Sequence, residues 1–197
     1  TERVKHGVFG YGKVEDEYFD SFFAWQKKHH GMEVAKENVR FATGVVGSLY
    51  AAVRAYTTEG ASVVICPPVY YPFYDAILNT GRKLVTCELD NQDGHYTLDL
   101  EKFEKAVTEN QVKMFILCSP HNPVCRVWTE EELDGVLGIC KKHGVLVVSD
   151  EIHQDFAYED HPFVSSGMVG GGKYRDILIV LNSGSKTFNL AGLIHSH

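Results

Sequence analysis

The sequence predicts an α/β fold in which helices cover both faces of a mostly parallel sheet, giving a three-layer α/β/α arrangement. The first reason is the order of the segments, since short apolar runs alternate with helical stretches along most of the chain. The second is that the apolar runs are continuous, which is typical of strands buried on both faces. No internal repeat, low-complexity tract or proline- and serine-rich linker interrupts the sequence after Val39. We therefore place no domain boundary within 39–197.

Residues 15–30 form the first predicted element, an amphipathic helix. Its large apolar residues recur at steps of three and four positions, and Gly31 follows as a stop signal. These residues are Tyr18, Phe19, Phe22, Phe23 and Trp25. We assign residues 1–38 to an N-terminal helical segment that leads into the α/β part.

The rest of the chain is expected to alternate between strands and helices. Strands are expected near 39–42, 62–66, 83–88, 113–118, 145–149 and 177–181. Helices are expected at about 47–58, 70–80, 99–108 and 129–143. The last helix opens with Thr129 and Glu132 at the spacing of a capping box.

The composition excludes several classes of function. With 197 residues, of which 44% are hydrophobic and 23% charged, the chain can bury a substantial core. A formal net charge of -7 and the lack of any basic block argue against a nucleic-acid partner or an anionic membrane surface. No apolar run reaches the length of a transmembrane helix. We therefore expect a cytoplasmic protein without a membrane or nucleic-acid partner.

Cysteine and histidine usage supports the same compartment and no metal site. The five cysteines form an odd set without a CxxC pair, and most lie in or beside apolar runs, so buried free thiols are expected. The ten histidines include no pair at HxxxH spacing with an acid. We therefore expect no metal.

The loops that follow the predicted strands carry the unusual residues, and in a parallel sheet they meet at one edge. Lys186 lies in the turn after 177–181, where dehydration would leave part of its amine uncharged and able to form a Schiff base. A lysine that caps a helix or lies on the surface is the alternative. Asp150 ends the run 145–149, where a buried acid needs a cation or several donors, although it could also cap a helix.

Three further loops reach the same edge. Gly44, Val45 and Val46 enter a helix whose free backbone N–H groups suit a phosphate, although glycine before a helix is common. Tyr70 follows two prolines and could lie flat on a planar ring or simply pack in the core. Asn122 stands between two prolines that fix its loop, which could also be an ordinary turn.

Together these groups describe a site for a phosphorylated pyridine aldehyde, and three motifs carry a resemblance to a known family. They are Ser-Pro-His-Asn-Pro at 119–123, Asp-Glu-Ile-His at 150–153 and Ser-Lys-Thr-Phe-Asn-Leu-Ala-Gly-Leu at 185–193. In this order and spacing they resemble the fold-type I pyridoxal-phosphate enzymes of aminotransferase class I/II, in particular the cystathionine β-lyase-like carbon-sulfur lyases. The resemblance extends from about Gly7 to His195.

The resemblance implies a role for each matching residue, with pyridoxal 5'-phosphate as the cofactor. Lys186 would hold it covalently, Asp150 would pair with the pyridine nitrogen, and Tyr70 would stack on the ring. Asn122 would bond the phenolic oxygen with His153 near the same edge. The phosphate would be held by the backbone at 44–46, by Ser183 and, from the other subunit of a homodimer, by Tyr11.

Two positions depart from the family pattern. Many aminotransferases have an arginine eight residues after the lysine, where this chain has Ile194, and this favours a lyase. Cys125 stands where relatives usually have glycine after Asn-Pro-Val. Relatives also continue into a smaller C-terminal domain absent from this chain, and Thr1 resembles the end of a helix. We therefore expect 39–197 to be a partial cofactor-binding large domain, of the PLP-dependent transferase type, from a longer enzyme.

The resemblance implies a carbon-sulfur β-lyase that acts on a small amino acid such as cystathionine. Its products would be a thiol, pyruvate and ammonia. A class I/II aminotransferase is the alternative, because both reactions use the same residues. A catalytically inactive binding or regulatory module with the same fold is the third possibility, against which the retained Lys186, Asp150 and Asn122 argue. The isolated piece itself is not expected to turn over substrate.

Overall fold

The structure is a computed structural model that describes residues 2–197. The chain forms two compact units, one that ends at Phe41 and one from Ala42 to His197. Thr1, where we expect the end of a helix, lies outside the described residues. The assignment of residues 39–197 to one cofactor-binding domain stays a prediction.

The first unit contains two helices and a short 3₁₀ turn. They are α1 (Glu2–His6), α2 (Asp16–His30) and η1 (Lys36–Asn38). Helix α2 confirms the amphipathic helix predicted at 15–30. Gly31 ends it in the left-handed conformation, with φ 63°, which glycine adopts at little cost.

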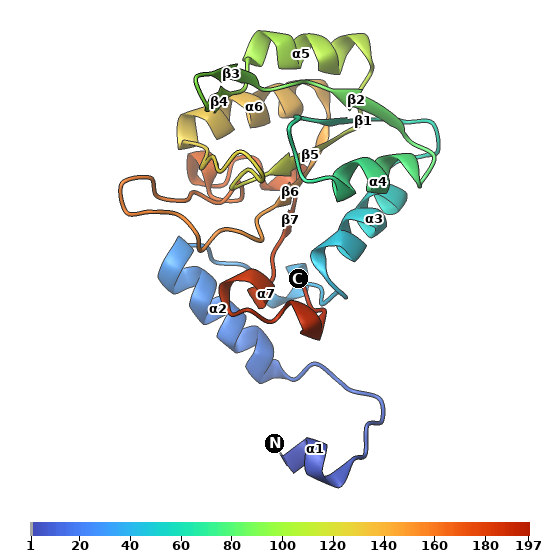
Figure 1. Cartoon of the computed structure of the whole chain (residues 1–197), viewed down its shortest axis with the longest axis vertical. Helices are drawn as coiled ribbons and strands as arrows, with labels where there is room; N and C mark the ends of the chain where they lie inside the picture. Colours follow the sequence, from blue (N-terminus) through green and yellow to red (C-terminus); the bar gives the residue numbers. More distant parts are fainter. Residues whose placement is uncertain (1) are drawn as a thin grey trace. The chain divides into compact units, whose positions relative to one another are not determined.

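The second unit is built on a five-stranded parallel sheet of order β2-β1-β5-β6-β7 (Figure 1). Its strands are β1 (Ser62–Ile65), β2 (Lys83–Thr86), β5 (Met114–Cys118), β6 (Leu146–Asp150) and β7 (Leu178–Leu181). Five of the six predicted strands are therefore confirmed. A separate antiparallel hairpin, β3 (Asp90–Gln92) with β4 (His95–Thr97), was not predicted.

Helices precede or follow each strand of the sheet. They are α3 (Val45–Tyr56), α4 (Pro72–Leu78), α5 (Leu100–Glu109), α6 (Glu130–His143) and α7 (Gly184–Thr187), with 3₁₀ turns η2 (Val169–Gly171), η3 (Arg175–Ile177) and η4 (Ala191–Leu193). The predicted capping box is present at the start of α6, where Thr129 and Glu132 bond each other's backbone N–H groups.

Two apolar cores lie on the two faces of the sheet. Helices α5 and α6 cover one face and α3 and α4 the other (Figure 1). Along β5, Phe115 and Leu117 enter the first core, while Met114 and Ile116 enter the second. Because successive side chains of a strand point to opposite faces, a strand between two helix layers must be apolar at every position. This confirms the three-layer arrangement.

The strand predicted at 39–42 is wrong. Only Ala42 pairs, in an isolated antiparallel bridge to Ser196 with two hydrogen bonds of 2.8 Å. Two residues later Gly44, with φ 85°, turns the chain directly into α3. The pairing therefore ends after one residue, and α3 begins before the predicted position 47.

Candidate functional site

The carboxyl ends of four neighbouring strands form one edge of the sheet. Cys118 of β5 pairs with Asp150 of β6, and Asp150 pairs with Leu181 of β7, so these strands end level with one another. Strand β1 runs parallel beside β5. The loops that begin at 66, 119, 151 and 182 therefore leave the sheet at the same edge, as predicted. The loop before α3, also predicted at this edge, follows no strand of the sheet.

The start of α3 reaches this edge through the last residues of the chain. His197 exchanges two backbone hydrogen bonds with Asn182, just after β7, while Ser196 is bonded to Ala42. Gly44 has no side chain to accept hydrogen bonds from the first turn of α3. Val45 is buried and Val46 is 37% exposed. The uncapped N–H groups of this turn suit an anion.

Asp150 is the buried acid of the site. It is 4% exposed, and its Oδ1 accepts the backbone N–H of Ile152 at 3.2 Å. Burial raises the pKa of Asp150 to about 7, and the neighbouring charge of Glu151 also raises it, while the Ile152 N–H and the charge of Lys186 lower it. A carboxyl with so few donors suits a ligand that brings a cationic N–H.

Lys186 lies in α7, directly after β7, and its charge affects Asp150 at the end of β6 and His153 in the loop after it. It lowers the pKa of Asp150, and it adds to the effect of burial in lowering the pKa of His153. The Thr187 hydroxyl donates to Asp155, which ties this turn to the loop after β6. The Lys186 side chain is exposed, so the expected dehydration of its amine is not supplied by residues 2–197.

Ser183 is the N-cap of α7 and is 5% exposed. Its hydroxyl accepts the Ser185 N–H at 3.0 Å and donates to the His195 carbonyl at 2.7 Å. These bonds fix the turn that carries Lys186.

Tyr70 and Asn122 come from the loops after β1 and β5. Burial raises the pKa of Tyr70, and the charges of Tyr71 and Asp150 raise it further. Tyr70 therefore lies within electrostatic range of Asp150. The backbone N–H of Asn122 donates to Cys118 Sγ at 3.4 Å. Within residues 2–197 the Asn122 side chain makes no hydrogen bond, so its amide is available to a ligand.

Tyr11 belongs to the first unit, where its side chain is fully exposed. Its contact with a phosphate in another subunit stays a prediction.

Two buried residues at this edge were not predicted to matter. Glu151 is fully buried, and its Oε1 accepts from Ser149 Oγ at 3.0 Å and from the Ser166 N–H at 2.8 Å. His121 is 2% exposed and contacts the Pro68 carbonyl. The sequence offered a signal for each residue: Glu151 is a second acid directly after Asp150, and His121 lies between two prolines in the loop of Asn122.

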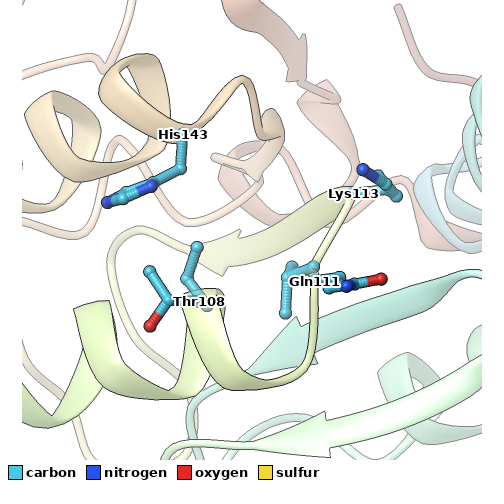
Figure 2. A pocket seen from close by; sticks show the side chains of 6 residues that line it. Thr108, Gln111, Lys113 and His143 are labelled. Carbon is cyan, nitrogen blue, oxygen red and sulfur yellow. The ribbon is translucent and has the colours of Figure 1, made fainter.

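The candidate site is distinct from a shallow pocket at the opposite edge of the sheet. Figure 2 shows that pocket, lined by Thr108, Gln111, Lys113 and His143 among others. Lys113 directly precedes β5, so the pocket lies at the amino ends of the strands.

Across residues 2–197 no cluster of three or more histidine, cysteine or acidic side chains could hold a metal ion. The same residues include no helix that is long and apolar enough to cross a membrane.

All five cysteines are free thiols, as expected. Four of them are buried, and Cys125 is exposed.

Comparison with known proteins gives concordant matches over nearly the whole chain. Among curated proteins, cystathionine beta-lyase PatB of Bacillus subtilis is 41% identical over 195 residues, which cover 98% of this chain and 49% of the relative. Protein MalY of Escherichia coli is 33% identical, with 98% and 49% covered. The chain therefore spans about half the length of the curated relatives it matches.

Solved structures agree. Cystalysin from Treponema denticola, described as containing a pyridoxal 5'-phosphate cofactor, superposes with a TM-score of 0.93 at 36% identity, covering 99% of this chain and 49% of that one. A PLP-bound C-S lyase from Staphylococcus hominis gives 0.93 at 34% identity, with 99% and 50% covered. The model of the family described as aminotransferase class I and II matches residues 5–194. The chain therefore belongs to the aminotransferase class I and II family.

Proposed function

We propose that this chain is the cofactor-binding part of a pyridoxal 5'-phosphate-dependent carbon-sulfur β-lyase that acts on cystathionine or a similar cysteine-type amino acid. One observation carries the proposal. A buried aspartate with a pKa raised to about 7 lies within electrostatic reach of Lys186 and Tyr70, at the edge where four parallel strands end. Relatives with the same fold include a PLP-bound C-S lyase.

The residues fit this cofactor group by group. A protonated pyridine nitrogen would give Asp150 the cationic donor that it lacks, and so offset the cost of burying its charge. The uncapped N–H groups at 45–46 would donate hydrogen bonds to the phosphate. The free amide of Asn122 would bond the ring oxygen, and Tyr70 would cover one face of the ring.

Pyridoxal phosphate, when bound, supplies an electron sink for a carbanion at the substrate α-carbon. Lys186 would anchor it covalently until a substrate amine displaces the Nζ atom. The released Nζ would then act as general base and take the α-proton. Asp150 would keep the pyridine nitrogen protonated, and His153 lies within electrostatic range of Lys186. Departure of the thiolate would leave pyruvate and ammonia after hydrolysis.

The lyase is preferred over the aminotransferase because of position 194, where Ile194 replaces the arginine expected by resemblance in many aminotransferases. Ile194 is 61% exposed. We further propose a cytoplasmic homodimer in which Tyr11 of one subunit reaches the phosphate of the other. Free thiols throughout the chain support a reducing compartment.

The test uses the full-length protein that contains this chain, saturated with pyridoxal phosphate. With cystathionine we expect pyruvate and a thiol in equal amounts. Borohydride should trap the cofactor on Lys186, and Lys186→Ala should remove both the trapped adduct and the product. Conversion of a keto acid by the pyridoxamine form, with no pyruvate from cystathionine, would assign an aminotransferase instead. A protein without any trapped adduct would be the inactive module.

A further inference from the structure

We propose that His121 is a positioning residue that joins the loop carrying Asn122 to the loop carrying Tyr70 and thereby sets the spacing of these two side chains. The inference rests on the proposed function, because it assumes that Asn122 and Tyr70 bind the same ring. It assigns a role to a buried side chain outside the cofactor groups named above.

A single hydrogen bond makes this connection. His121 Nε2 lies 3.0 Å from the Pro68 carbonyl oxygen. A carbonyl can only accept, so Nε2 must carry the hydrogen and donate it. Pro68 is two residues before Tyr70, and His121 directly precedes Asn122. A bond between the loops after β1 and β5 therefore fixes both side chains relative to each other.

His121 is held firmly from the side of its own loop. Its backbone N–H donates to the Arg126 carbonyl at 2.7 Å, which closes the loop around Asn122. Its ring meets the Trp128 ring edge to face, with centroids 5.4 Å apart. Trp128 Nε1 in turn donates to the Cys118 carbonyl at 2.9 Å. The ring therefore has a fixed direction from which to reach Pro68.

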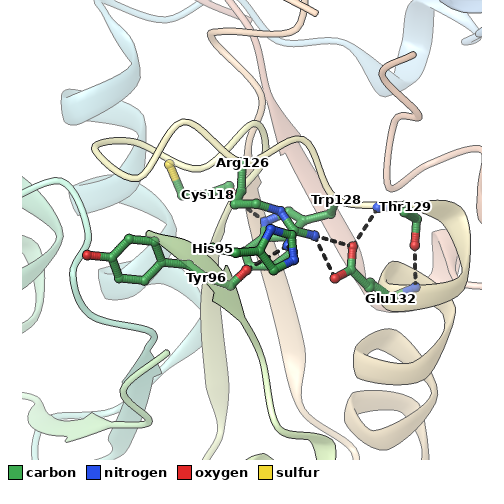
Figure 3. A network of polar contacts seen from close by, with 7 residues as sticks. All are labelled: His95, Tyr96, Cys118, Arg126, Trp128, Thr129 and Glu132. Atoms are coloured by element: carbon green, nitrogen blue, oxygen red, sulfur yellow. Dashed lines mark hydrogen bonds and ion pairs between the residues drawn. The ribbon is translucent and has the colours of Figure 1, made fainter. Parts of the chain in front are cut away.

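The base of this loop is anchored to the hairpin and to α6. Figure 3 shows the Arg126 guanidinium between the Tyr96 carbonyl, at 2.6 Å, and both Glu132 carboxylate oxygens, at 2.6 and 2.7 Å. Nη2 donates to both carboxylate oxygens while Nη1 donates to the Tyr96 carbonyl, so the planar guanidinium is held from two sides. The loop is thus rigid at its base, and His121 supplies its link to the neighbouring loop.

The ring is neutral over the physiological range. Burial lowers the pKa of His121 to about 4, although the carbonyls of Pro68, Cys66 and Cys118 favour the charged form. Its Nδ1 is buried without a hydrogen bond within residues 2–197. At neutral pH the uncharged ring therefore keeps the hydrogen on Nε2 that it donates to the Pro68 carbonyl.

A matched pair of variants tests the connection in the full-length protein. Glutamine places an amide N–H donor near the position of Nε2, whereas asparagine is too short to reach Pro68. We expect His121→Asn to weaken pyridoxal phosphate binding about tenfold, the loss of one buried hydrogen bond, and His121→Gln to stay within about threefold of the parent. Binding is measured by the absorbance of the protein-bound cofactor.

Hydrogen-deuterium exchange of the cofactor-free protein provides a readout independent of binding. His121→Asn should speed exchange in 66–71 and 119–126 only, and His121→Gln should restore protection. Phe103→Leu, on the buried face of α5, is the control for an overall loss of stability. Equal exchange in the Asn and Gln variants, or a pattern like that of the control, overturns the proposal. If the parent protein binds no pyridoxal phosphate, the proposed function fails, while the exchange data still decide whether His121 joins the loops.

Discussion

Replacing Asp150 by asparagine should stabilise the cofactor-free chain while destroying its cofactor site. In the folded chain burial raises the pKa of this carboxyl from 3.8 to about 7. Folding therefore favours the protonated carboxyl. The free energy of unfolding falls as the pH rises from the pKa of the unfolded chain, 3.8, toward the pKa of the folded chain, about 7. At about 1.4 kcal/mol per pH unit, the ionised carboxyl costs about 4 kcal/mol above pH 7.

Asp150→Asn removes this cost because the amide stays neutral. Its advantage in free energy of unfolding should grow by about 3 kcal/mol between pH 5 and pH 8, since over most of that range the carboxyl is ionised only in the unfolded chain. Urea unfolding at both pH values measures the difference. Asp160→Asn, which removes an exposed charge, is the control. An advantage that does not change with pH would refute the assignment of a raised pKa to Asp150.

The cofactor should reverse this ranking. Binding stabilises only a protein that holds the ligand, so saturating pyridoxal phosphate should raise the stability of the parent full-length protein and leave that of Asp150→Asn nearly unchanged. Equal stabilisation of the two proteins would mean that Asp150 does not pair with the cofactor.

Three further predictions concern the scaffold, each measured as the free energy of unfolding in urea. Thr129→Ala should cost about 1 kcal/mol by removing the N-cap of α6, whereas Thr129→Ser should keep most of it. Cys125→Gly should stabilise the chain by up to about 1 kcal/mol, because Cys125 has φ 58°, where glycine is unstrained. A lower free energy of unfolding in this variant would show that the contacts of the thiol outweigh the backbone strain. Arg126→Lys should cost about 2 kcal/mol because the single lysine nitrogen cannot bond both Glu132 and the Tyr96 carbonyl, as Nη2 and Nη1 of Arg126 do. Lys27→Ala, at an exposed ion pair, should change stability by less than about 0.5 kcal/mol, and equal effects of the two substitutions would contradict this explanation.

Most of the sheet could be predicted because its central strands are buried on both faces. β5 is apolar at every position and β6 at its first three, a pattern that solvent-facing segments do not show. The capping box and Gly31 gave two helix ends for the same kind of reason, since they are local signals with a local cause.

The errors occurred where structure depends on a distant part of the chain. Residues 39–42 have an apolar pattern, but among the described residues the one bridge they form joins Ala42 to Ser196, more than 150 positions away. The hairpin β3–β4 is polar and mostly exposed, so its sequence carries no burial signal, and the Arg126 bond to the Tyr96 carbonyl holds it in place. Its two-residue turn, Asp93-Gly94, has positive φ at both residues and is the local signal that the prediction missed. The pairing of Ala42, in contrast, cannot be recognised from neighbouring residues alone.

The site shows the same division, because the sequence predicted Asp150 as the site acid but did not show how its environment differs from that of Glu151. Both Asp150 and Glu151 are buried at the end of β6. Glu151 accepts hydrogen bonds from Ser149 and Ser166, so the protein already satisfies one of its oxygens twice. Asp150 receives only the Ile152 N–H at 3.2 Å. The acid with the poorer internal partners gains more from a cationic ligand, and this difference in hydrogen bonding supports the proposal that Asp150, and not Glu151, pairs with the cofactor.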